Sequence, residues 1–88
     1  MVEKAIIFAA KAHEGMFRKG TEIPYIVHPM EAGAIAASVT SDKEVIAAAV
    51  LHDTLEDTGT TAEEIENEFG KEVLRLVQSD SEDKREDL

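Results

Sequence analysis

The feature that most constrains this 88-residue chain is an apolar run that ends abruptly in ionisable side chains. Residues 44–51 read EVIAAAVL, and residues 52–57 read HDTLED. A run that is apolar on nearly every side predicts a buried helix rather than a surface helix. Burying charge is costly unless the charge is paired or bound to a metal. The polar cluster at the end of this helix therefore predicts a binding site.

The spacing within this cluster separates the ionisable residues into pairs. His52 and Glu56 are four residues apart, as are Asp53 and Asp57, so each pair is expected on one side of a helix, a turn apart. A solvated helix end would explain the acids but not their position directly after an apolar run. Acids at the negative end of a helix dipole are also unfavourable, and a bound cation would remove that cost. Histidine and carboxylate without sulfur suit manganese, iron or zinc.

Composition excludes several other classes of function. The net charge is −10, from 19 acidic and 9 basic residues, which argues against binding duplex nucleic acid through a basic face. The chain has no cysteine, which excludes disulfides and thiolate metal sites. The start of the chain lacks the features of a signal peptide, and no apolar run approaches the roughly 20 residues of a membrane span. We therefore expect a soluble, cytoplasmic protein without membrane contact.

Helical periodicity and capping signals predict an all-α fold, a compact bundle of about five helices. The central, buried helix is expected at about 42–57, starting at a capping box over residues 41–44. A second capping box over residues 61–64 predicts a short helix that ends before Gly70. The other helices are expected at about 3–16, from His28 onward, and from 71 to about 79. Residues 1–79 form the predicted domain, and residues 80–88 a polar, solvated or disordered tail.

The segment between the first two helices carries candidate substrate contacts. Arg18 and Lys19 precede Tyr25 and His28 in a loop that Gly20 allows to turn. If this loop folds back over the metal, Arg18 can pair with phosphate or stack on a base, and Lys19 can supply a point charge. Tyr25 can contact a sugar or a ring, and a half-buried packing role for it is equally compatible with the sequence. His13, on the apolar face of the first helix, is expected to be a satisfied core histidine.

Four blocks of the sequence resemble a known family. Residues 12–19 (AHEGMFRK), 24–29 (PYIVHP), 49–58 (AVLHDTLEDT) and 69–73 (FGKEV) are similar to HD-domain hydrolases of the RelA/SpoT type, and in particular to small alarmone hydrolases. The order and spacing of the blocks agree over roughly residues 5–84. The resemblance implies that residues 1–79 are the N-terminal part of one HD-type metal-dependent hydrolase domain.

The resemblance also implies an activity and the residues that perform it. Such enzymes remove the 3′-pyrophosphate from guanosine tetra- and pentaphosphate, usually with Mn²⁺. The implied metal ligands are His28, His52 and Asp53, and the implied acids that position or deprotonate the attacking water are Glu56 and Asp57. The implied nucleotide contacts are Arg18, Lys19 and Tyr25. The family has a fourth ligand, an aspartate on a later helix, in a segment that would follow Leu88.

Two alternatives to this activity stay open. The loop from Arg18 to Pro24 is one residue longer than in the bifunctional synthetase-hydrolases, which favours a phosphohydrolase of another nucleotide. The position of the family's fourth ligand favours a catalytically silent, truncated helical module. Because the later helices of the family would cover one side of the central helix, we also expect self-association into a homo-oligomer.

Overall fold

The computed structural model describes the backbone of residues 1–86 and the side chains of residues 1–79. Its described part is all-α, as predicted, and the one extended pairing within it is an isolated antiparallel bridge between Phe17 and Pro24. The helices are α1 (Val2–Ala12), α2 (Val27–Val39), α3 (Lys43–Leu51), α4 (Thr54–Asp57), α5 (Ala62–Phe69) and α6 (Lys71–Glu86). None of these helices is both long enough and apolar enough to cross a membrane.

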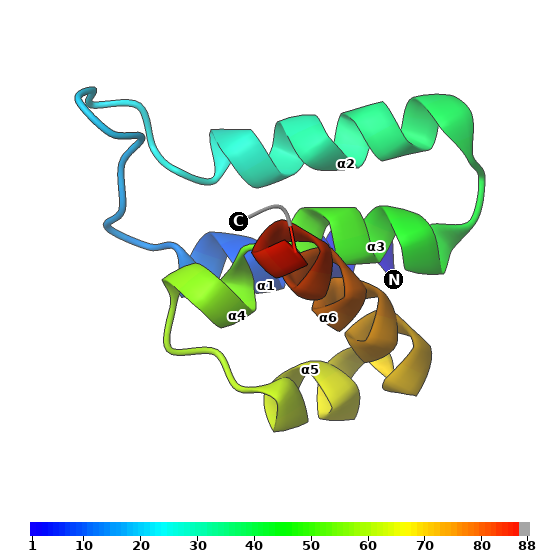
Figure 1. Ribbon diagram of the computed structural model, residues 1–88. Coiled ribbons are helices and arrows are strands. Elements are labelled where there is room, and N and C mark those ends of the chain that lie inside the picture. Colours follow the sequence, from blue (N-terminus) through cyan, green and yellow to red (C-terminus); the bar gives the residue numbers. More distant parts are fainter. Residues whose placement is uncertain (87–88) are drawn as a thin grey trace.

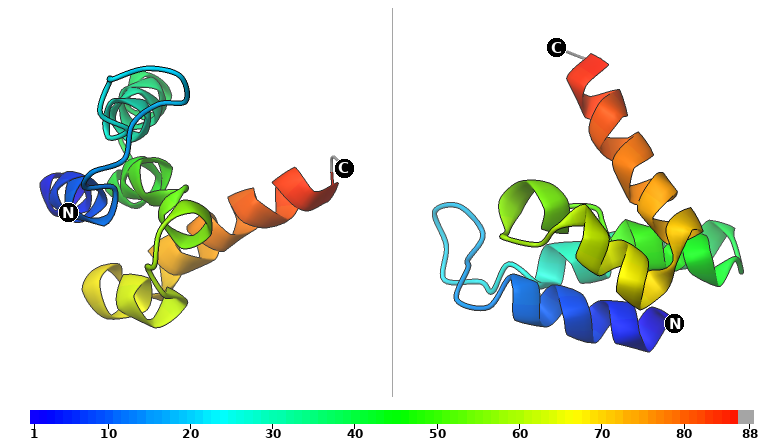
Figure 2. Two further views of the ribbon diagram at one scale, coloured as in Figure 1. Left: turned by 90° about the vertical axis from the view of Figure 1, so that its left-hand side faces the viewer. Right: turned by 90° about the horizontal axis from the view of Figure 1, so that it is seen from below.

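Helix α3 lies at the centre of the bundle and packs against α1, α2 and α6 (Figure 1). Figure 2 shows α1 and α2 on one side of α3, with α5 and α6 on the other. The buried core joins α3 to α1, α5 and α6, through Ala5, Ala9, Ala47, Ala48, Val50, Leu51, Ile65, Phe69, Val73 and Val77. The predicted burial is therefore confirmed for the second half of the apolar run, whereas Val45 in its first half is exposed. Of the polar residues that follow, Asp53 and Thr54 are buried.

The predicted central helix is interrupted at residues 52–53. His52 donates from Nδ1 to the carbonyl oxygen of Ala49 at 2.7 Å, and the Thr54 hydroxyl donates to the carbonyl oxygen of Leu51 at 2.7 Å. These side-chain donors occupy the carbonyl groups at the end of α3, which ends the helix at Leu51. The chain then resumes as the single turn α4, so a continuous helix over 42–57 was wrong in this detail.

Three further boundaries differ from the sequence predictions. Helix α1 ends at Ala12 rather than near residue 16, because the chain turns through Gly15 at a φ of +82°. The cap of α3 is Asp42 rather than Ser41, and its side chain accepts from the Glu44 backbone N–H at 3.0 Å. Helix α6 continues beyond residue 79 to Glu86, because residues 80–86 contain no glycine or proline to end it. The rest of the predicted tail, residues 87–88, lies outside the described residues.

The second capping box is confirmed. The Thr61 hydroxyl accepts from the Glu64 backbone N–H at 3.1 Å, and the Glu64 carboxylate accepts from the Thr61 backbone N–H at 3.0 Å. Helix α5 therefore begins where the sequence predicted it.

The close approach of α2 to α3 predicts a steric cost at Gly33. A Cβ atom at Gly33 would lie 2.6 Å from Cγ2 of the buried Val50. Val50 has a stiff β-branched side chain, so we expect Gly33→Ala to lower the free energy of unfolding by about 1–2 kcal/mol despite alanine's better helix propensity. Urea denaturation measures this change. The matched control is Gly59→Ala, where a Cβ meets nothing within 4 Å. Equal stabilities of the two variants would contradict the tight contact.

Candidate metal centre

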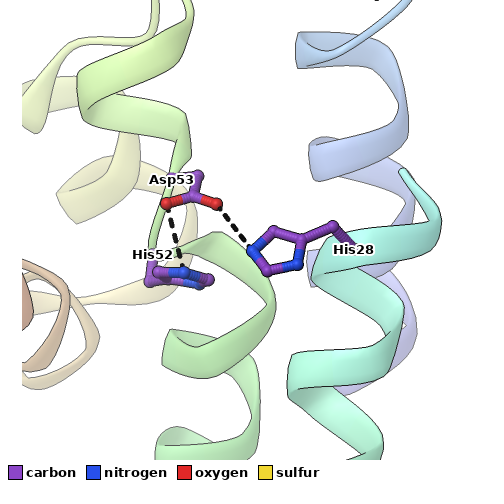
Figure 3. Close-up of side chains that lie close together, drawn as sticks. All are labelled: His28, His52 and Asp53. Carbon is purple, nitrogen blue, oxygen red and sulfur yellow. Dashed lines mark ion pairs between the residues drawn. The ribbon is translucent and has the colours of Figure 1, made fainter. Parts of the chain in front are cut away.

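Three side chains from two parts of the chain converge on one point (Figure 3). His28 belongs to the first turn of α2, while His52 and Asp53 lie between α3 and α4. His28 Nε2 lies 3.3 Å from Asp53 Oδ2, and His52 Nε2 lies 3.1 Å from Asp53 Oδ1. One potential ligand atom from each residue lies within 4.8 Å of the others. The three residues that the sequence nominated as metal ligands are thus brought together, at a distance that a single ion can span.

The carboxylate at the middle of this cluster is buried. Asp53 is 3% exposed, whereas the side chains of His52 and His28 are 15% and 40% exposed. The cluster therefore has a closed side at Asp53 and opens toward solvent at His28. A carboxylate at this depth carries a desolvation cost that its neighbours must offset.

The position of the proton on the His52 ring indicates whether the three side chains suit a cation. The Ala49 carbonyl oxygen can only accept, so the Nδ1 atom that contacts it carries a proton. In the neutral ring, Nε2 then presents a lone pair to Asp53 Oδ1, and two acceptors face each other. A proton on Nε2 or a cation between the two atoms removes this repulsion. An Nδ1–H bonded to a backbone carbonyl is the usual arrangement of metal-ligating histidines. The cluster can accordingly hold a divalent cation.

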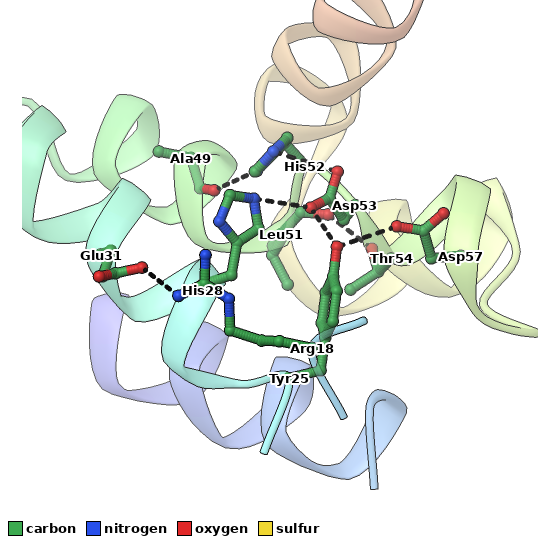
Figure 4. A network of polar contacts seen from close by, with 10 residues as sticks. All are labelled: Arg18, Tyr25, His28, Glu31, Ala49, Leu51, His52, Asp53, Thr54 and Asp57. Carbon is green, nitrogen blue, oxygen red and sulfur yellow. Dashed lines mark hydrogen bonds and ion pairs between the residues drawn. The ribbon is translucent and has the colours of Figure 1, made fainter. Parts of the chain in front are cut away.

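The two acids nominated for catalysis lie on α4, directly after the cluster. Glu56 and Asp57 are both exposed. Asp57 is tied to the cluster through Tyr25, whose hydroxyl lies 3.0 Å from Asp53 Oδ2 and 3.2 Å from Asp57 Oδ2 (Figure 4). The Tyr25 hydroxyl thus lies between Asp57 and the buried carboxylate of Asp53, and Glu56 lies on the same helical turn as Asp57.

The environment of Tyr25 keeps its hydroxyl protonated. Burial first, and then the hydrogen bond and negative charge of Asp53 and the charge of Asp57, raise the pKa of the Tyr25 hydroxyl above its ordinary value. The group therefore acts as a hydrogen-bond donor at neutral pH. Its hydroxyl is directed at two carboxylates, so this part of Tyr25 serves the cluster.

The nominated basic residues lie on a short hairpin. Arg18 donates its backbone N–H to the Ile23 carbonyl at 2.9 Å, and Gly20 supplies the turn with a φ of +76°. The Arg18 guanidinium reaches Glu31 at 3.4 Å, one turn along α2 from His28 (Figure 4). Arg18 is therefore brought near the cluster, whereas Lys19 is exposed in the turn of the hairpin.

Two residues of this region were missed or only partly predicted. Glu31 pairs with Arg18, and its spacing of three residues from His28 on a predicted helix was the available signal. His13 is buried at 2% exposure, as predicted, but only Nδ1 is satisfied, by the Ala9 carbonyl at 2.8 Å. Its Nε2 has no hydrogen-bond partner among the described residues. The prediction of a fully satisfied core histidine was therefore wrong for this nitrogen.

Comparison with known proteins decides the family. The family model described as HD domain matches residues 5–86. The chain belongs to the HD domain family. This HD domain is 44% identical to a GTP pyrophosphokinase of Myxococcus xanthus and 47% identical to a guanosine-3′,5′-bis(diphosphate) 3′-pyrophosphohydrolase of Aquifex aeolicus. It is 43% identical to the bifunctional (p)ppGpp synthase/hydrolase SpoT of Escherichia coli strain K12.

Each of these three alignments covers 88% of this chain, and the chain spans 10–11% of the length of the relatives. The resemblance to the RelA/SpoT type is confirmed over most of the HD domain.

Proposed function

We propose that this HD domain is a metal-dependent phosphohydrolase that releases pyrophosphate from the 3′ position of guanosine tetra- and pentaphosphate, with Mn²⁺ as its cofactor. The observation that carries the proposal is the convergence of His28, His52 and Asp53, with His52 Nε2 facing a carboxylate oxygen 3.1 Å away. The names of the relatives from Aquifex aeolicus and Escherichia coli support the substrate.

In this proposal the buried carboxylate and the two imidazoles hold the ion. When bound, a divalent cation polarises a phosphoryl oxygen and makes water more acidic. Glu56 and Asp57, exposed on α4 beside the cluster, orient the attacking water and accept its proton. Attack at phosphorus needs alignment of water and leaving group more than covalent chemistry. The contacts of Asp53 with His28, His52 and Tyr25 keep the ligand set in place for that alignment.

The substrate side of the proposal assigns Arg18 and Lys19 to the phosphates. The chain has a net charge of −10, so an anionic nucleotide needs local positive charge from the metal and from these residues. The ion pair of Arg18 with Glu31 is exposed on both sides and is therefore weak. A phosphate can displace Glu31 and take the guanidinium in a bidentate contact.

The test is pyrophosphate release by the purified protein in the presence of MnCl2. Guanosine tetraphosphate is expected to lose its 3′-pyrophosphate, and GDP, which has none at that position, is the matched negative substrate. His52→Ala is expected to abolish the release, and a chelator is expected to do so reversibly. If the metal-loaded protein cleaves only another nucleotide, the substrate assignment fails. If it cleaves no 3′-phosphorylated nucleotide, the proposed function fails.

A further inference from the structure

The Tyr25 hydroxyl touches both the buried carboxylate of the cluster and an acid on α4. It lies 3.0 Å from Asp53 Oδ2 and 3.2 Å from Asp57 Oδ2. The residue itself comes from the segment before α2, so the contact joins three parts of the chain (Figure 4). A phenol has a single hydrogen, and ionised carboxylates only accept. The two carboxylates therefore share one donor, which lies between them and ties the position of each to the same hydroxyl.

The ring of Tyr25 is held on several sides. The His13 ring stacks on it with centroids 4.8 Å apart, and the His28 ring meets it edge-on at 5.8 Å. His13 is itself fixed by its hydrogen bond to the Ala9 carbonyl at 2.8 Å. The Tyr25 backbone N–H donates to the Met16 carbonyl at 2.9 Å. These contacts leave the hydroxyl little freedom to follow a moving carboxylate, so the carboxylates adjust to the hydroxyl.

The hydrogen bond also decides how the Asp53 carboxylate is rotated. The terminal torsion of aspartate is broad, so without a fixed donor the plane of the carboxylate can turn away from the two histidines. With Tyr25 in place, Oδ2 faces His28 and the phenol, while Oδ1 faces His52. Partners that orient a metal ligand in this way are worth about 10- to 100-fold in metal affinity or activity.

We propose that Tyr25 is a positioning residue that fixes the rotation of the Asp53 carboxylate and sets Asp57 at a constant distance from it. This role rests on the proposed metal-dependent hydrolysis, and it differs from the nucleotide contact that the family resemblance implied for Tyr25. A nucleotide contact would act on substrate binding. A positioning residue acts on the affinity for the metal and on the rate of the chemical step.

The test is Tyr25→Phe, which keeps the ring and its packing and removes only the hydroxyl. We expect calorimetric titration with MnCl2 to show about a tenfold or greater loss of affinity at an unchanged fold. In the hydrolysis assay we expect kcat to fall while KM for guanosine tetraphosphate changes little. Thr21→Val is the matched control, because among the described residues the hydroxyl it removes bonds within the hairpin, to the Arg18 carbonyl and the Ile23 N–H.

The outcomes separate this role from the proposed function. Unchanged Mn²⁺ affinity with a raised KM would overturn the positioning role and restore a nucleotide contact. Wild-type behaviour of Tyr25→Phe in both assays would also overturn it. Weakened Mn²⁺ binding in a protein that hydrolyses no nucleotide would support the positioning of Asp53 and refute the hydrolase. If the metal-free Tyr25→Phe variant has a lower melting temperature but an unchanged affinity for Mn²⁺, Tyr25 only contributes to packing, and the proposal is contradicted.

Discussion

Asp53→Asn is expected to weaken Mn²⁺ binding by more than about 100-fold, because even the outer partners of metal ligands are worth 10- to 100-fold. Asp53 is the acid of the cluster, is 3% exposed, and faces both histidines within 3.3 Å. Asparagine keeps the size of the side chain and an oxygen that can accept from Tyr25, so the fold is expected to survive. Calorimetric titration measures the affinity directly.

Thermal unfolding with and without Mn²⁺ gives a second measure of the same change. At a metal concentration of 100 times Kd, the wild type gains about 2.7 kcal/mol of stability, and the variant is expected to gain almost none. Asp42→Asn is the matched control, because it removes the same charge at the exposed cap of α3, where asparagine caps equally well. If Asp53→Asn and Asp42→Asn bind Mn²⁺ alike, the cluster is not the metal site.

Leu51→Ala is expected to lower the free energy of unfolding by about 2–5 kcal/mol, the cost of a cavity in a closed core. Leu51 is fully buried at the end of α3, directly before the cluster. A domain of 88 residues has a modest reserve of stability, so this loss is a large fraction of the total. Urea denaturation is the measurement, with its midpoint expected to move sharply downward.

The control for Leu51→Ala is an apolar residue that the bundle does not bury. Ile7 on α1 is 57% exposed, and Ile7→Ala is expected to change stability by no more than about 0.5 kcal/mol. Comparable losses in the two variants would show that the described packing of α3 is incorrect.

The sequence was most informative where local patterns coincided with burial. The apolar run over residues 44–51 predicted the central helix because α3 packs against three other helices, α1, α2 and α6. The second capping box predicted the start of α5 because its two hydrogen bonds form between residues three apart. The cluster at His52 and Asp53 could be proposed because charge next to a buried run requires compensation.

Other features could not be predicted from the sequence, either because local hydrogen bonds compete with one another or because they depend on contacts between distant segments. The end of α3 is set by side-chain donors from His52 and Thr54, and their preference for backbone carbonyls competes with helix continuation. The position of Tyr25 between two carboxylates arises from the hairpin before α2, which the sequence described only as a loop. His28 entered the predicted ligand set through the family resemblance, since spacing alone does not bring α2 beside the end of α3.

Self-association stays a prediction. Large apolar side chains are exposed on α2, namely Met30, Ile35 and Val39. Exposed apolar surface of this kind favours contact with a partner. Sedimentation of the purified protein tests the prediction, and a compact monomer at all concentrations would contradict it.

The most direct measurement of the central claim is the anomalous scattering of Mn²⁺ in crystals of this protein grown with MnCl2. We expect one strong peak within direct coordination distance of His28 Nε2, His52 Nε2 and an Asp53 carboxylate oxygen, and no such peak in Asp53→Asn crystals. Crystals in which these three side chains are ordered as described, while the manganese peak lies elsewhere or is absent at saturating MnCl2, would contradict the assignment of this cluster as the metal centre.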